Sequence, residues 1–136
     1  MKRWYRFLAA VLVLSLLFCG CSGGRVRAVE KIIPESELYS KSEIESAMSV
    51  VTRTFRSGFD GCTMLEIAYD EEKTLKEMER NAENGETGDV MILVSSFKVG
   101  EKSDGSLSPN TTYDGWSWEL TRSGLGGWKL TNYGYG

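Results

Sequence analysis

The chain has 136 residues, enough for one domain, and its hydrophobic (41%) and charged (26%) fractions are ordinary for a globular protein. It contains no histidine, which excludes Ser–His–Asp and Cys–His catalysis and zinc sites that use histidine ligands. The formal net charge of −3 argues against a basic nucleic-acid-binding surface, so we expect no nucleic-acid partner.

The first residues have the pattern of an export signal. Lys2, Arg3 and Arg6 precede an uncharged, almost wholly apolar run from Phe7 to Phe18. This run is shorter than the roughly 20 residues of a membrane-spanning helix and fits the apolar region of a secretory signal, which is about 7–15 residues long. A cleaved signal is therefore favoured over a retained anchor helix.

Two of the three cysteines follow this run, as Cys19-Gly20-Cys21, and the third is Cys62. Three cysteines are too few for a four-cysteine zinc site, and a site with all three would need residues of the predicted signal. The stretch 17–21 instead resembles a bacterial lipobox, in which an apolar residue and two small residues precede a cysteine. Phe18 departs from the usual leucine. The resemblance implies cleavage between Gly20 and Cys21 and a diacylglyceryl thioether on Cys21.

This processing defines three parts of the chain. Residues 1–20 are predicted to be a lipoprotein signal peptide, 21–39 a lipid-anchored tether, and 40–136 a globular domain. A diacylglyceryl group supplies the two acyl chains that stable anchoring requires. We therefore expect a protein attached to the cell membrane on its extracytoplasmic face. Cys62 is interpreted as a small buried hydrophobe, with an exposed reactive thiol as the alternative.

The globular domain is predicted to begin with an amphipathic helix over about residues 42–57. Two overlapping capping boxes, Ser40 to Glu43 and Ser42 to Glu45, precede it, and Gly58 ends it. Apolar residues recur at intervals of three and four, which predicts a stripe facing the core. These residues are Ile44, Ala47, Met48, Val51 and Phe55.

A strand and a second helix are predicted next. The stretch 63–69 alternates, and we expect Leu65, Ile67 and Tyr69 to share one face. Asp70 can cap a helix that ends at Asn84-Gly85. The inner side of that helix is predicted to consist of Leu75, Met78 and Ala82.

Three strands are predicted to follow. They are an apolar run over 89–100, an alternating segment around 116–121 and a last segment from Trp128 to Tyr135, with a loop over 101–114. The order is helix, strand, helix and three strands. We expect an α+β fold in which the N-terminal helix packs on a curved antiparallel sheet of about four strands.

The domain resembles a group of small uncharacterised lipoproteins of Gram-positive bacteria, described as cystatin-like or nuclear transport factor 2-like. The resemblance covers most of the chain from about Ser40 to Tyr135 and implies the fold rather than an activity. The full transport-factor-like cone has additional helices that this chain is too short to contain. The motifs concerned are Gly61-Cys62, Tyr69-Asp70-Glu71, the stretch 95–98, Trp116-Ser117-Trp118 with Arg122, Gly127-Trp128, and 133–135.

Carboxylates are the remaining acid–base groups, and Glu66 and Glu119 lie on predicted strands. A carboxylate on an inner sheet face would have a raised pKa, as general bases often do. Strand alternation instead places both on the solvated outer face. We therefore predict no catalytic residue, no metal site and no cofactor, and an enzyme is the less favoured class. A small hydrolase or isomerase that uses a pocket carboxylate is kept as an alternative.

Aromatic residues concentrate in the last 24 residues and are the candidate binding groups. They either fill the core or form a rim that stacks a sugar, peptide or lipid. We expect a non-catalytic binding or accessory module for an unknown small ligand or envelope protein. A structural envelope protein is a further alternative. The residues concerned are Trp116, Trp118, Trp128, Tyr133 and Tyr135.

Overall fold

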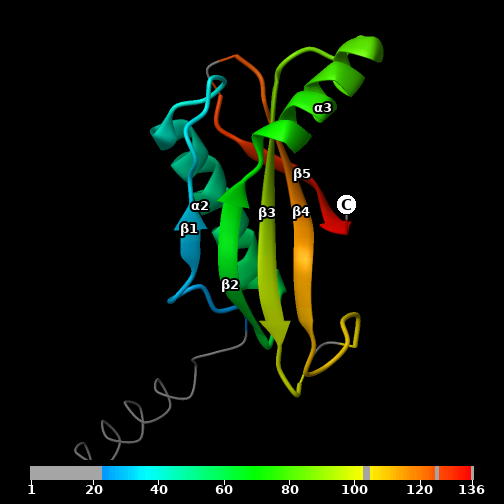
Figure 1. Cartoon of the computed structure of the whole chain (residues 1–136). Coiled ribbons are helices and arrows are strands. Elements are labelled where there is room, and N and C mark those ends of the chain that lie inside the picture. The colour runs from blue at the N-terminus through cyan, green and yellow to red at the C-terminus, as the bar shows by residue number, and fades with distance from the viewer. Residues whose placement is uncertain (1–22, 103–104, 125, 136) are drawn as a thin grey trace, which may run out of the picture.

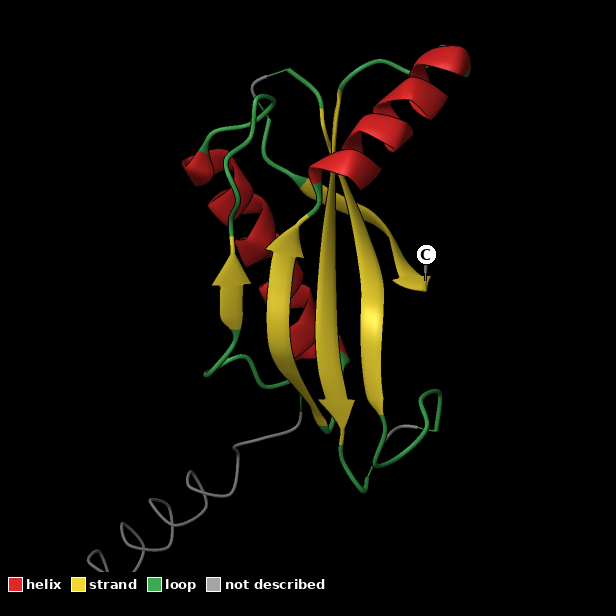
Figure 2. Ribbon diagram, viewed as in Figure 1, coloured by secondary structure: helices red, strands yellow, loops and turns green. Residues whose placement is uncertain are grey.

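The computed structural model describes residues 23–102, 105–124 and 126–135. The predicted cleavage and lipidation sites, Gly20 and Cys21, lie outside these residues. Two helices and a five-stranded sheet with strand order β1-β2-β3-β4-β5 form an α+β fold (Figures 1 and 2). The elements are β1 (Glu30–Ile32), α2 (Lys41–Gly58), β2 (Cys62–Tyr69), α3 (Glu71–Glu83), β3 (Asp89–Val99), β4 (Thr112–Arg122) and β5 (Lys129–Tyr135).

The α+β class is confirmed, but the predicted sheet is wrong in three respects. It has five strands rather than about four, it is mixed because β1 runs parallel to β2, and it is not strongly curled. The additional strand is β1, which lies within the stretch 21–39 that the sequence predicts to be a tether.

The segment before β1 is fixed to the end of α2. The Gly24 N–H donates to the Arg56 carbonyl oxygen at 3.0 Å, and Arg25 forms a parallel bridge with Thr63. A Cβ atom at Gly24 would overlap the carbonyl oxygen and the ring of Phe55. Only glycine therefore allows this close approach, which leads the chain directly into the edge of the sheet.

Helix α2 begins as predicted. The Ser40 side chain accepts from the Glu43 N–H, and the Glu43 side chain accepts from the Ser40 N–H, which completes the first capping box. The whole predicted apolar stripe of α2 is buried against one face of the sheet, which we call the inner face. The opposite face is called the outer face.

The inner face of β2 differs from the predicted alternation. A register shift between Met64 and Glu66 places a β-bulge at Leu65. Met64 is therefore in the core at 1% exposure, whereas Leu65 is 43% exposed. Ile67 and Tyr69 are buried as predicted.

Helix α3 lies on the outer side of the sheet and is attached mainly at its first turn (Figure 1). The Thr74 hydroxyl donates to the Asp70 carbonyl oxygen at 2.7 Å and accepts from the Ile92 N–H at 3.0 Å. Thr74 is the buried residue of α3, whereas Leu75 is 50% exposed. The predicted inner side of α3 is therefore wrong, because this hydrogen bond to β3 turns the Thr74 side of the helix toward the sheet.

Candidate functional site

Pairing of β4 with β5 brings four of the five predicted binding aromatics together on the inner face. Trp116 lies opposite Tyr135, and Trp118 lies opposite Tyr133. The fifth, Trp128, precedes β5 and lies apart from this group, beside Tyr39. The predicted binding aromatics therefore form one group on β4 and β5 and a separate position at Trp128.

Trp118 is a core residue. Its exposure is 0%, and its indole N–H donates to the Ser95 hydroxyl oxygen at 2.8 Å, a hydrogen bond that is itself buried. This bond explains a serine in the middle of an apolar strand, because a buried indole N–H needs an acceptor. Trp118 is therefore inaccessible to a ligand.

Trp128 has a structural role at the other end of the sheet. Its ring is 7% exposed and meets the Tyr39 ring edge-on at 5.4 Å. The Arg122 guanidinium lies 4.3 Å from the Trp128 ring centroid, within range of a cation–π interaction. Arg122 also pairs with Asp89 at 2.8 Å and Glu43 at 2.6 Å, so it joins β3, β4 and the start of α2.

Tyr39 is buried in the same region. Its hydroxyl donates to the Val90 carbonyl oxygen at 2.7 Å. Burial raises the pKa of Tyr39 to about 12, and the nearby Asp89 charge adds to this effect. The Trp128 end of the sheet is thus a structural cluster, and a cavity of about 530 Å³ lies beside Arg122 and Trp128.

The accessible rings form a separate group, which we call the aromatic surface: Tyr113, Trp116, Tyr133 and Tyr135. Tyr133 and Tyr135 are 51% and 63% exposed, and Trp116 is half-buried. The Trp116 and Tyr135 ring centroids are 5.4 Å apart, and those of Tyr113 and Tyr135 are 5.5 Å apart. Tyr135 makes its ring contacts with these two sheet residues alone among the described residues.

Phe59 joins the aromatic surface to α2, and the sequence prediction missed it. It is the C-terminal cap of α2, where its N–H donates to the Phe55 carbonyl oxygen at 3.0 Å. Its ring lies 5.7 Å from Tyr133 and 6.3 Å from Trp116. An apolar residue just after a helix-ending glycine often packs back on the helix, which is the signal that could have identified it.

A cavity of about 270 Å³ opens beside Phe59 at the end of α2. Trp116, Tyr133 and the buried Cys62 contribute to its wall, together with Asp60. Cys62 is 1% exposed, which favours the buried hydrophobe over the reactive exposed thiol. The aromatic surface and this cavity together form an apolar, ring-lined hollow with one acidic group.

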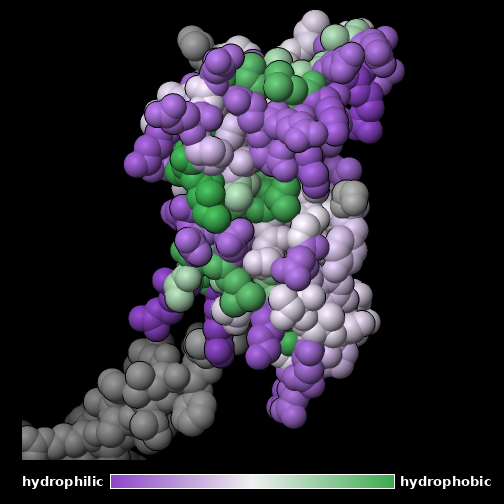
Figure 3. Space-filling view, in the orientation of Figure 1, coloured by the Kyte–Doolittle hydropathy of each residue, from purple (hydrophilic) through white to green (hydrophobic). Residues whose placement is uncertain are grey.

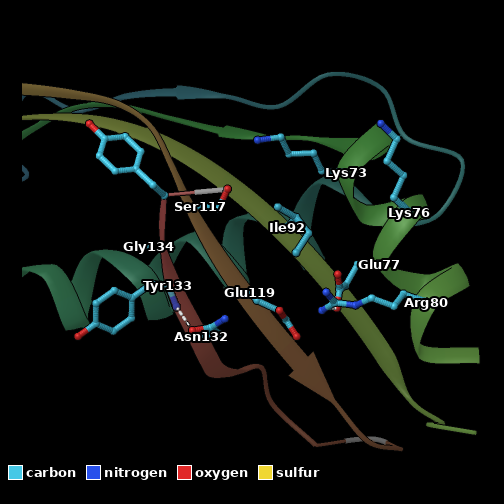
Figure 4. Close-up of a pocket in the computed structure, with 11 residues that line it drawn as sticks. Lys73, Lys76, Glu77, Arg80, Ile92, Ser117, Glu119, Asn132, Tyr133 and Gly134 are labelled. Carbon is cyan, nitrogen blue, oxygen red and sulfur yellow. Dashed lines mark hydrogen bonds and ion pairs between the residues drawn. The ribbon is translucent and has the colours of Figure 1, made fainter. Parts of the chain in front are cut away.

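The two candidate carboxylates are on the outer face and are not brought together. Glu66 lies opposite Ser96 on β3, whereas Glu119 lies between Ile92 of β3 and Asn132 of β5. Their outward position agrees with the alternation. Glu119 nevertheless lines a groove of about 350 Å³ between α3 and the outer face of β4 and β5 (Figure 4).

Burial raises the pKa of the Glu119 carboxyl, and the negative charges of Glu77 and Glu86 raise it further, while Arg80 lowers it. The wall next to Glu119 consists largely of charged α3 side chains rather than apolar ones. Within the described residues, no group of three or more cysteine, aspartate and glutamate side chains is placed to hold a metal ion.

Comparisons of the chain with models of protein families, with curated proteins and with solved structures find no match. Among residues 23–102, 105–124 and 126–135, no helix is long and apolar enough to cross a membrane.

Proposed function

We propose that this protein is a lipid-anchored extracytoplasmic binding module that holds its ligand on the aromatic surface. The anchoring part of the proposal rests on the apolar run 7–18 and the lipobox-like stretch ending at Cys21. The resemblance to small cystatin-like or nuclear transport factor 2-like lipoproteins agrees with the α+β fold.

One observation supports the binding part of the proposal most directly. Tyr133 and Tyr135 expose half or more of their surface on an otherwise well-filled inner face. Tyrosine rings provide rigid contact area that is both apolar and hydrogen-bonding, and ordering them on binding costs little entropy. The adjoining Trp116 and Phe59 extend this contact area into the cavity. The ligand class that fits best is one with a flat apolar face, such as a sugar ring of an envelope glycan.

The test is a titration with chitobiose, a disaccharide of N-acetylglucosamine, followed by NMR of the tyrosine ring protons. Tyr135→Ala should weaken binding by about tenfold, because stacked rings contribute about 0.5–1.5 kcal/mol in addition to the area that they bury. Lys129→Ala is the matched control, since Lys129 is an exposed residue of the same strand. Equal binding by both variants would contradict the proposal.

A hydrolase or isomerase that uses Glu119 is the second candidate. The raised pKa of a carboxyl in a groove is the observation that favours it, since general bases are tuned in this way. Activity on an ester, amide or ketone substrate that disappears in Glu119→Gln and persists in Glu66→Gln would support an enzyme. Loss of activity in neither variant would exclude Glu119 as its base.

A further inference from the structure

The groove below α3, which we call the outer groove, has other lining residues than the aromatic surface except at its edge, where Tyr133 and Tyr135 belong to both. It exists because the Thr74 hydroxyl fixes the first turn of α3 to β3, while the rest of the helix leans away from the sheet (Figure 1). Hydrophilic side chains cover α3, and the apolar areas visible on this face are separate patches (Figure 3). Charged groups of α3 therefore line one wall, and the sheet provides the floor.

The floor has hydrogen-bonding capacity that the described residues do not use. The half-buried Glu119 carboxylate has no hydrogen bond or ion pair to any of them. The Asn132 side-chain oxygen accepts from the Tyr133 N–H at 3.0 Å, but no described group accepts from its amide N–H₂. The Ser117 hydroxyl, on the same part of the floor, is likewise unpaired within the described chain. A partly buried carboxylate without a donor is unfavourable, and a donor from a ligand would compensate it.

The wall formed by α3 carries basic side chains and therefore favours an anionic group of a ligand. Arg80 is paired with Glu77 of the same helix (Figure 4), and Lys76 is paired with Glu72 at 3.1 Å. Lys73 has no ion-pair partner in the described part of the chain. A ligand that is only a cation would face these basic side chains, and one that is only an anion would face Glu119. Both would therefore meet repulsion.

We propose that the outer groove binds a small zwitterion, with its ammonium end on the Glu119 carboxylate and its anionic end toward Lys73. The Asn132 amide N–H₂ and the Ser117 hydroxyl would hydrogen-bond the polar atoms between these ends. A volume of about 350 Å³ is at the lower end of the range of ligand sites and suits a dipeptide-sized molecule. Ile92 and the rings of Tyr133 and Tyr135 form the apolar part of the lining, which the short carbon chain of such a molecule can contact.

Ligand binding should change the ionisation of Glu119 in a defined direction. An ammonium group favours the charged carboxylate, so it should lower the pKa of Glu119, which burial, Glu77 and Glu86 raise in the free protein. Arg80, the opposing positive charge, is present in both states. This shift provides a readout that does not depend on the aromatic surface.

The experiment uses the whole processed chain in detergent micelles and NMR of the Asn132 amide and the Glu119 carboxyl. Glycylglycine should shift the Asn132 signals in a saturable way and lower the pKa of Glu119. N-acetylglycylglycine lacks the ammonium and glycylglycine amide lacks the carboxylate, so each should bind at least about tenfold more weakly, the loss of one charge-assisted contact. O-phosphoethanolamine tests a phosphate as the anionic end. If it binds more tightly than glycylglycine, the ligand belongs to the zwitterions that carry a phosphate.

Two variants and their controls complete the test. Glu119→Gln and Lys73→Met should each weaken glycylglycine binding by about tenfold or more. Glu66→Gln and Lys98→Met remove one negative and one positive charge at other positions of the sheet and should not weaken this binding. Equal binding of N-acetylglycylglycine, or no response to glycylglycine and O-phosphoethanolamine, would overturn the proposal. Tyr113→Ala, which changes the aromatic surface but not the lining of the groove, should leave these responses unchanged and so separates the two sites.

Discussion

The hydrogen bond between Trp118 and Ser95 provides the sharpest test of how this sheet is built. Ser95 is 3% exposed and accepts from the Trp118 indole N–H at 2.8 Å, whereas its neighbour Ser96 lies at the bulge of β3 and is half-buried on the outer side. Ser95→Ala keeps the packing nearly unchanged but leaves the indole N–H buried without an acceptor. The expected loss is about 1–3 kcal/mol in the free energy of unfolding.

The measurement is urea unfolding of residues 22–136, followed by far-UV circular dichroism so that changes in tryptophan emission do not interfere. With a slope of about 1–3 kcal/mol per molar urea, the midpoint should fall by roughly 1 M. Ser96→Ala is the matched control and should change the midpoint little. In a double-mutant cycle, Trp118→Phe and Ser95→Ala should show a coupling of about 1 kcal/mol. Equal effects of the two serine variants, with no coupling, would refute the reasoning.

Three further predictions concern the anchor, the edge of the sheet and the outer groove. Cys21→Ser should leave the protein in the soluble fraction or as an uncleaved precursor, and membrane retention with normal processing, by fractionation and mass spectrometry, would contradict lipidation. Gly24→Ala should cost more than about 1 kcal/mol in thermal unfolding because its methyl group meets Phe55, whereas Gly127→Ala, with open space around it, should not. Glu119→Gln should become more stable than the original chain as pH rises, because folding raises the pKa of Glu119 above the ordinary 4.5. The stabilising effect of the protonated carboxyl is fully present below the unfolded-state pKa. It is lost as pH rises through the folded-state pKa, whereas the glutamine keeps it. A parallel pH dependence for both chains would count against this.

Much of the fold follows from local signals in the sequence. The capping box at Ser40 locates the start of α2, and its three- and four-residue apolar spacing identifies the buried side. These signals are local because helix formation depends on neighbours within four residues. The strand β1 could not be found in this way, since its parallel pairing joins Glu30 to Glu66, far along the chain.

Two other differences have specific physical causes. A strict period of two cannot anticipate a β-bulge, so one extra residue exchanges the positions of Met64 and Leu65. The orientation of α3 is set by the Thr74 hydroxyl bond to β3, which outweighs the weak apolar pattern that included Leu75. In both cases one local interaction with a neighbouring strand decides the outcome.

The candidate site was only partly predictable for a related reason. Composition identifies the aromatic residues, but whether a ring is core or surface depends on where α2 ends. Trp118 is fully buried and bonds to Ser95, while Tyr135 is 63% exposed at the end of β5. The outer groove depends on the tilt of α3 away from the sheet, and no pattern in the sequence indicates this tilt.

The hydrogen bond from Gly24 to Arg56 has a consequence for where the domain can be in the cell. If Cys21 bears the lipid, only Ser22 lies between it and Gly23, and each of the two steps covers at most about 3.3–3.6 Å in an extended chain. The domain would then stand within about 7 Å of the headgroups, with the end of α2 facing them. Such a short link would let the domain rotate but would keep it close to the membrane. Any ligand of the aromatic surface would have to come to the membrane surface to be bound.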